Sequence, residues 1–360
     1  MGEIDEMNSK NAATLFAILA AGLYAINIPL SKIILEHASP TITAGLLYLG
    51  AGIGIFGYSK LKVLLGKGDD AEPLTKKELP YTIAMVVLDI AAPIMLMVGI
   101  TMTNSSTVSL LNNFEIVGTT IVALLFFNEK VSIRLWIAII LITFASVILS
   151  FDGKEDISLN VGALLVLGAA VCWGFENNCT RMISNKNTNE IVIIKGLFSG
   201  VGSIITGLVI GDSFPQGKWI AAILLLGFVS YGLSINMYIM AQKHLGAAKT
   251  SAYYSVAPFL GVIFSFVLLG ESISIEFFIG LIIMAISAVL LVKDNITLQH
   301  THEHVHTHTH QHSHGDMVHT HEHQHRHVHQ HVHNEDENFH GHQHKNKNKN
   351  VGYYGHGHLH

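Results

Sequence analysis

Long apolar runs alternate with short polar connections through the first 295 residues of this 360-residue chain. A helix that crosses a lipid bilayer needs about 20 mostly apolar residues. The pattern predicts ten membrane-spanning helices, and hence an all-α membrane protein, over Ala12–Leu35, Thr41–Tyr58, Pro80–Met102, Ser105–Phe127, Ile133–Phe151, Leu159–Ile183, Ile191–Ile210, Trp219–Met240, Ala247–Leu269 and Ile275–Val292.

The charge distribution predicts how these helices are oriented. With the N-terminus in the cytoplasm, thirteen Lys and Arg residues lie on the inner side and three on the outer side, as the positive-inside rule requires. The polar residues 1–11 lack the basic start of a signal peptide and are predicted to stay as a cytoplasmic N-terminus. We therefore expect a multi-pass protein of the plasma membrane with both termini in the cytoplasm.

An internal repeat predicts the architecture. Ser109–Leu149 aligns without gaps on Ser251–Leu291 at an offset of 142, with nine of 41 positions identical. The repeat unit has five spans, in residues 12–151 and again in 159–292. Because five is odd, the second copy is inverted, as in many secondary transporters. A duplicated scaffold without transport is the alternative.

Two short segments, NEKVSI and GESISI, occupy matching places in the two repeats. Each holds a glutamate at a helix end, Glu129 in the first repeat and Glu271 in the second. A carboxylate is favoured at the N-terminus of a helix. Both are therefore predicted to be structural and to cap the helix that follows.

These motifs resemble those of the drug/metabolite transporter superfamily, and specifically its EamA-like permeases. The resemblance is carried by FFNEKVS, LLGESIS, GAAVCWGFENNCTR and Ala257-Pro258, and covers about residues 12–292. It implies ten spans in two five-span repeats and a transport function, without naming a cargo. The proline has no counterpart in the first repeat, where Glu115-Ile116 takes its place, so no helix break is expected there.

Few ionisable residues lie inside the spans, and such residues usually face a cavity or a partner. Glu115 and Glu176 are candidates for binding a cation or a coupling proton, and Lys195 is the expected partner of Glu176. A fixed ion pair that only holds helices together is the alternative for each. The predicted transport cavity comprises Glu115, Glu176, Asp89, Lys195, Asn27, Asn113, Asn236 and Trp173.

The composition excludes several classes of protein. Half of the residues are hydrophobic and 13% are charged, against about 25% charged in soluble domains, and the mean hydropathy is +0.43. The formal net charge of -5 argues against a nucleic-acid partner. The sequence has no P-loop and no HExxH motif, so we predict neither an enzyme nor an ATP-driven pump.

Histidine is concentrated in the last part of the chain. Of the 24 histidines, all but His37 and His244 lie in residues 300–360. This segment has too few large apolar residues for a core, so residues 293–360 are predicted to be a disordered cytoplasmic tail unless a ligand binds.

Imidazole binds Zn, Ni, Co and Cu, and alternate spacing puts successive rings on one side of an extended chain. The predicted metal ligands are His300, His302, His304, His306, His308, His310, His312, His314, His319, His321, His323, His325, His327, His329, His331 and His333. No other cofactor is required.

The preferred interpretation is a secondary transporter of small metabolites with a metal-binding tail; export is the favoured direction and proton coupling is left open. One alternative is a transporter of divalent Ni, Co or Zn, and another is a metal store or sensor tethered to a transport-like scaffold. The expected partners are the lipid bilayer and a small-molecule or ion substrate. Formation of a homodimer stays open.

Overall fold

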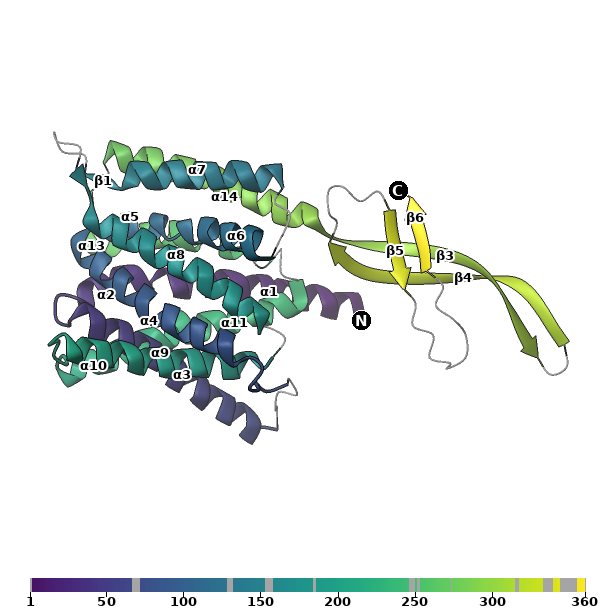
Figure 1. Ribbon diagram of the computed structural model, residues 1–360, viewed down its shortest axis with the longest axis horizontal. Coiled ribbons are helices and arrows are strands. Elements are labelled where there is room, and N and C mark those ends of the chain that lie inside the picture. The colour runs from purple at the N-terminus through teal and green to yellow at the C-terminus, as the bar shows by residue number, and fades with distance from the viewer. Residues whose placement is uncertain are drawn as a thin grey trace. The chain divides into compact units, whose positions relative to one another are not determined.

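The computed structural model describes residues 2–66, 72–127, 132–152, 158–183, 186–245, 250, 253–272, 274–314, 317–332, 339–343 and 355–359. The chain divides into two compact units, Met1–Lys293 and Asp294–His360. The first unit is a bundle of helices and the second contains strands (Figure 1).

In the first half of the bundle the elements are α1 (Gly2–Ala25), α2 (Asn27–Ile34), α3 (Pro40–Leu64), α4 (Leu79–Met102), α5 (Ser105–Leu111), α6 (Phe114–Phe127) and α7 (Ile133–Leu149). A pair of two-residue antiparallel strands, β1 (Phe151–Asp152) and β2 (Ser158–Leu159), follows. The second half contains α8 (Val161–Met182), α9 (Thr188–Val209), α10 (Gly217–Gly227), the π-helix η1 (Phe228–Leu233), α11 (Ser234–Leu245), α13 (Ala257–Leu269) and α14 (Ile275–Leu298).

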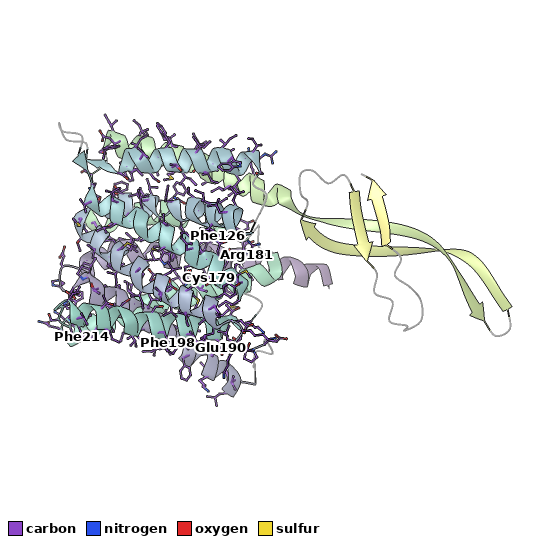
Figure 2. The ribbon with its side chains drawn as sticks, in the orientation of Figure 1. Phe126, Cys179, Arg181, Glu190, Phe198 and Phe214 are labelled. Atoms are coloured by element: carbon purple, nitrogen blue, oxygen red, sulfur yellow. The ribbon has the colours of Figure 1, made fainter. Side chains whose placement is uncertain are left out.

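Eight helical segments in the described residues are long and apolar enough to cross a membrane, and two further apolar helices, α7 and α13, are shorter. Large apolar side chains cover the outside of the bundle, as Phe126 and Phe198 illustrate (Figure 2). A soluble protein rarely exposes such a continuous apolar surface, so the bundle is a multi-pass membrane domain. Residues 247–249 and 251–252 of the predicted span Ala247–Leu269 lie outside the described residues.

Polar side chains begin several of these helices. Asn160 accepts a hydrogen bond from the Ala163 N–H (2.9 Å), and Asn187 accepts one from the Glu190 N–H (3.1 Å). Two serines at equivalent places in the repeats do the same: Ser132 caps α7 and Ser274 caps α14. Such caps satisfy N–H groups that have no partner within the helix.

Several spans are interrupted near their middle. A turn at Ile26 separates α1 from α2, Pro93 lies inside α4, and η1 replaces α-helical backbone in the span that α10 begins. A turn at Asn112–Asn113 separates α5 from α6, and a turn at Ser255–Val256 precedes α13. The expectation that the first repeat has no break was therefore wrong, because two asparagines end the helix there without a proline.

Glycines bring helices of the two halves into close contact. A Cβ on Gly50 of α3 would lie 2.1 Å from the Leu224 carbonyl oxygen of α10, and a Cβ on Gly227 would lie 2.0 Å from the Leu47 carbonyl oxygen. A Cβ on Gly196 of α9 would lie 2.5 Å from the Gly52 backbone nitrogen. Small residues are typical of such membrane helix interfaces, and here they hold α3 against α9 and α10.

The second unit differs from the disordered tail that the sequence predicts. Strands β3 (Gln299–His314) and β4 (Met317–Val332) pair antiparallel, as do β5 (Phe339–Gln343) and β6 (Gly355–Leu359). Histidine alternates with Thr, Val, Gln and Glu along β3 and β4, and this alternation matches the two-residue period of a strand. A pair of strands alone is only marginally stable in water, so a ligand that bridges them would stabilise them markedly.

Replacing Gly50 by alanine should destabilise the bundle. The added methyl group would overlap backbone atoms of α10, which cannot move independently, and overpacking of this kind costs about 1–3 kcal/mol. Gly57 lies in the same helix and has nothing within 4 Å of a built Cβ. We expect thermal unfolding in detergent to show a lower melting temperature for Gly50→Ala than for the wild type, and an unchanged melting temperature for Gly57→Ala. Equal melting temperatures for the two variants would contradict the close packing.

Candidate functional site

A buried ion triad lies inside the bundle. Lys195 of α9 places its Nζ 3.2 Å from Asp89 Oδ2 of α4 and 3.0 Å from Glu176 Oε1 of α8. The side chains of Asp89 and Glu176 are 0% and 1% exposed, and that of Lys195 is 20% exposed. The predicted contact of Glu176 with Lys195 is thus present, and Asp89 joins it as a second carboxylate.

The triad is connected to two aromatic side chains. The hydroxyl of Tyr48 in α3 donates to Asp89 Oδ1 (2.9 Å), and the indole N–H of Trp173 donates to that hydroxyl (3.3 Å). Because Pro93 has no N–H, the helix loses the hydrogen bond that would end on the Asp89 carbonyl. Both the side chain and the backbone of Asp89 therefore belong to a polar region within the membrane domain.

Glu115 lies close to the triad, but it has different partners. It sits in the first turn of α6 and accepts a hydrogen bond from Asn177 Nδ2 of α8 (2.6 Å). The positive end of the helix dipole favours a carboxylate at this position. Among the described side chains, no Lys, Arg or His nitrogen lies within 4.0 Å of Glu115. Glu115 is half-buried, so it remains accessible to a ligand.

Tyrosines from three interrupted spans surround this region. The ring of Tyr24 packs edge-to-face on Tyr231 at 6.0 Å between centroids and lies 5.9 Å from Tyr254. Asn27, the first residue of α2, donates to the Tyr231 hydroxyl (3.1 Å), and Tyr231 lies 5.5 Å from Tyr48. Glu115 is close enough to interact electrostatically with all three of Tyr24, Tyr231 and Tyr254.

Two of the predicted cavity residues have hydrogen-bond partners outside the ion triad. Asn113 donates to the Leu110 carbonyl within its own span (3.2 Å), and Asn236 donates to Asn189 at the start of α9 (3.2 Å). Sequence analysis missed Tyr24, Tyr48, Tyr231, Tyr254 and Asn177. An aromatic residue in an apolar span gives no signal that separates a cavity position from a lipid-facing one. Asn177 could have been found, because it follows Glu176 directly in the motif GAAVCWGFENNCTR.

The predicted metal ligands lie in the second unit. Seven histidine pairs face each other across the β3–β4 register, from His300 opposite His331 to His312 opposite His319. His314 is opposite Met317, and His333 lies outside the described residues. Within the bundle residues that the structure describes, no three His, Cys, Asp or Glu side chains come together as a metal site.

Hydrogen bonds within the first half and between the halves hold the end of the bundle where α4 ends and α5 begins. The Glu271 carboxylate accepts hydrogen bonds from the N–H groups of Ser105 (2.7 Å) and Ser106 (2.9 Å). Lys32 donates to the Thr103 carbonyl (2.8 Å) and to the Ile100 carbonyl. Glu271 was predicted to cap the helix that follows it, but it caps α5 of the other half, and Ser274 caps the helix that follows. Glu129 lies outside the described residues.

At the opposite end of the bundle, hydrogen bonds join the segment before α4 to the beginning of α9. Arg181 and Glu190 lie at this end, away from Phe214 (Figure 2). Glu190 accepts a hydrogen bond from the Leu74 N–H (2.9 Å), and Lys186 donates to Glu72 (2.8 Å). This hydrogen bond lowers the pKa of Glu72 and raises the pKa of Lys186.

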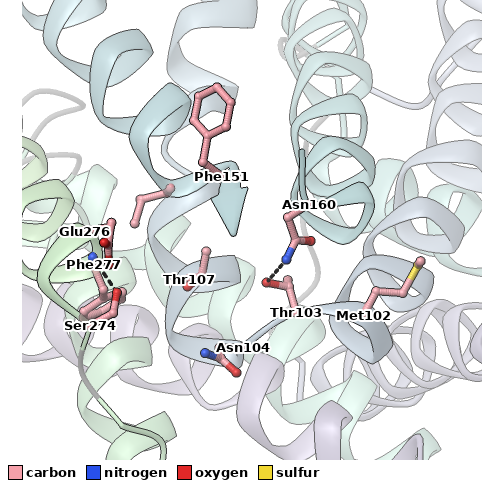
Figure 3. A pocket seen from close by; sticks show the side chains of 10 residues that line it. Met102, Thr103, Asn104, Thr107, Phe151, Asn160, Ser274, Glu276 and Phe277 are labelled. Carbon is pink, nitrogen blue, oxygen red and sulfur yellow. Dashed lines mark hydrogen bonds between the residues drawn. The ribbon is translucent and has the colours of Figure 1, made fainter. Parts of the chain in front are cut away.

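A surface cavity of about 420 Å³ lies at the α4–α5 end, near Glu271 (Figure 3). Its wall includes Thr103, to which Asn160 donates a hydrogen bond (3.4 Å), and Glu276. Asp89 precedes Met102, at the rim, by thirteen residues of α4, which is roughly 20 Å of helix. The cavity is therefore distinct from the ion triad and offers at most an entrance.

The comparison with known families decides the identity. The model of the EamA-like transporter family matches the chain twice, over residues 11–151 and 160–293. The chain belongs to the EamA-like transporter family. Members of this family are transporters of small substrates rather than enzymes. The two matches coincide with the two halves of the EamA-like bundle, and they agree with the family resemblance that the motifs indicated.

Individual relatives of this EamA-like protein are distant. An uncharacterized transporter of Methanothermobacter thermautotrophicus is 25% identical over 275 residues, covering 72% of this chain and 79% of the relative. The uncharacterized transporter YoaV of Bacillus subtilis is 22% identical over 284 residues, covering 70% and 94%. A protein solved by crystallography has a TM-score of 0.58 and 15% identity, covering 79% of this chain and 97% of its own; it supports the fold alone.

Removing the cation of the triad should destabilise the EamA-like bundle. Lys195→Ala leaves two buried carboxylates without compensation, and breaking a buried pair in this way costs about 3–5 kcal/mol. We expect a clear loss of unfolding free energy in detergent. Combining Lys195→Met with Asp89→Asn and Glu176→Gln removes all three charges and should recover most of that loss.

Lys77→Ala is the matched control, because Lys77 is exposed and loss of an exposed charge should change stability little. If Lys195→Ala unfolds like the wild type, or if the triple variant is no more stable than Lys195→Ala, the buried triad does not hold the helices as described.

Proposed function

We propose that this protein is a secondary transporter whose small solute binds inside the bundle, between the ion triad and Glu115. The observation that carries the proposal is the meeting of interrupted spans from both halves around buried charge. Discontinuous membrane helices line substrate and ion sites in transporters, because their free backbone groups can serve a ligand. Intramembrane ionisable groups likewise mark transport pathways.

The proposed mechanism is alternating access between two inverted five-span repeats, which together make ten spans. The two family matches support it, and so do the turns at Asn112–Asn113 and Ser255–Val256, which lie within one residue of equivalent repeat positions. Exchange of conformations between the halves would open the site to each side in turn. The Lys and Arg distribution favours cytoplasmic termini in the plasma membrane, and export remains the preferred direction.

Glu115 is the proposed group for coupling. It is the carboxylate of the cluster that forms no ion pair with Lys195, and it is half-buried where Asp89 and Glu176 are buried. A carboxylate that is open to each side in turn can exchange a proton or a cation with either solution. We therefore propose that transport is coupled to protons through Glu115.

Flux measurements in vesicles containing the purified full-length chain test this proposal. We expect saturable uptake of at least one solute from a panel of organic cations, zwitterions, anions and neutral metabolites, with a rate that depends on pH. Glu115→Gln should remove that pH dependence, because the amide cannot titrate. Glu36→Gln, an exposed carboxylate outside the cluster, should retain it. Transport by Glu115→Gln that matches wild type at all pH values would refute the coupling role.

The register of β3 and β4 favours a second activity, binding of divalent metal by the tail. Residues directly opposite each other in an antiparallel pair lie on the same face, with Cβ atoms about 4.5–5.5 Å apart. The seven histidine pairs therefore share one face of the hairpin. Imidazoles from two neighbouring pairs would supply the four ligands that Zn prefers. We propose that the tail binds several Zn, Ni, Co or Cu ions and that binding stabilises the hairpin.

Calorimetric titration of Zn into the full-length chain tests the tail. We expect several ions per chain, with affinity falling below about pH 6 as histidine protonates. A variant ending at Lys293 should bind none of these ions. A second variant keeps the composition but moves the histidines of 319–331 into one uninterrupted run. Consecutive residues of a strand point to opposite faces of the hairpin, so this variant should bind metal several-fold more weakly. Equal affinity of this variant would show that register is irrelevant.

A further inference from the structure

We propose that Glu115 and the three rings of Tyr24, Tyr231 and Tyr254 form a binding site for an organic ammonium cation. This inference rests on the proposed transport function and names the class of cargo. The ligand would be an amine or quaternary ammonium group of a small molecule. Its charge would lie against the Glu115 carboxylate, and its alkyl groups would lie against the rings.

The charge balance of the cluster points to a cation. Three carboxylates, those of Asp89, Glu176 and Glu115, face a single lysine, and Lys195 is engaged by the first two. Glu115 accepts one side-chain hydrogen bond, from Asn177, whereas an ionised carboxylate has about four acceptor positions. Among the described residues no cation lies within 4.0 Å of Glu115, and Lys195, which attracts it from a longer distance, is already held by the other two carboxylates. A positive group from solution is therefore the natural complement of Glu115.

The aromatic surroundings indicate what kind of cation fits. Tyr24, Tyr231 and Tyr254 come from three different interrupted spans. The ring centroid of Tyr24 lies 6.0 Å from that of Tyr231 and 5.9 Å from that of Tyr254. Ring faces attract diffuse, weakly hydrated cations, and groups of aromatic rings recognise ammonium ligands. A hard metal ion instead needs several oxygen ligands at 2.0–2.6 Å. A site made of one carboxylate and the faces of three rings does not provide such a ligand set.

Accessibility separates this site from the two carboxylates of the ion triad. Glu115 and the three tyrosines are each half-buried, whereas Asp89 and Glu176 are buried. The negative charge of those two carboxylates would repel the carboxylate of a zwitterion, and Lys195 already lies within 3.2 Å of both of them. The triad therefore acts as a fixed element beside a site that receives a cation.

Binding by the full-length chain in detergent tests the chemistry directly. The probes are benzyltrimethylammonium, a permanent cation, benzoate, an anion of similar size, and benzyl alcohol, a neutral molecule. We expect saturable quenching of aromatic fluorescence by benzyltrimethylammonium and none by the other two. Uptake of the same three labelled probes into vesicles gives an independent measurement of transport.

Variants separate the carboxylate from the rings. Glu115→Gln should weaken binding of benzyltrimethylammonium roughly tenfold or more, because the amide has no charge. Tyr254→Phe keeps the ring and should bind nearly as the wild type, whereas Tyr254→Leu should bind roughly threefold to tenfold more weakly. Glu36→Gln is the control with an exposed carboxylate removed. The two Tyr254 variants keep the test decisive if Glu115→Gln does not fold.

The outcomes distinguish this inference from the transport proposal. Glu115-dependent binding of the cation without flux of any probe would support the site and count against transport. Flux or binding of benzoate or benzyl alcohol in preference to the cation would leave transport standing and overturn the cation site. The cation site is also wrong if Glu115→Gln and Tyr254→Leu both bind the cation with wild-type affinity. Absence of both binding and flux would contradict both proposals.

Discussion

A charge within a membrane domain needs a partner of opposite sign, and Lys195, between two buried carboxylates, sets this requirement for the whole bundle. Its two carboxylate partners come from α4 in the first half and α8 in the second, while Lys195 itself is on α9. The three helices cannot rotate or slide separately without exposing a charge to an apolar environment. This constraint aligns the halves, and it leaves Glu115 as the carboxylate that is not held by lysine.

The interruptions in the spans have a common physical basis. Backbone groups within a membrane must be satisfied by protein or must line a polar cavity. Here the breaks are turns, a proline inside α4 and a π-helix, and the residues in or beside them include Asn27, Glu115 and Tyr231. The polar backbone and the polar side chains therefore occupy the same region, and the remaining helix surface can be apolar towards lipid.

Hydrophobic patterning predicts most of the helices because length and apolarity alone decide whether a segment can cross a bilayer. The Glu176–Lys195 pair was also predictable, since adjacent spans place both near one end. Asp89 could not be assigned as the third partner, because its span packs there only in the folded bundle. Spacing did not show that Glu271 reaches α5, nor that Asn112–Asn113 ends a helix. The tail hairpin follows from the alternation of histidine, but composition alone favoured disorder.

The hydrogen bonds of Glu271 have a mechanical consequence. One side chain of the segment before α14 holds the first two N–H groups of α5, so the end of the second half and the beginning of a first-half helix move as one body. Any widening at this end must either carry α5 along or leave two amide donors unsatisfied. The boundary between moving parts therefore does not follow the boundary between the two halves of the sequence, but crosses it at this carboxylate.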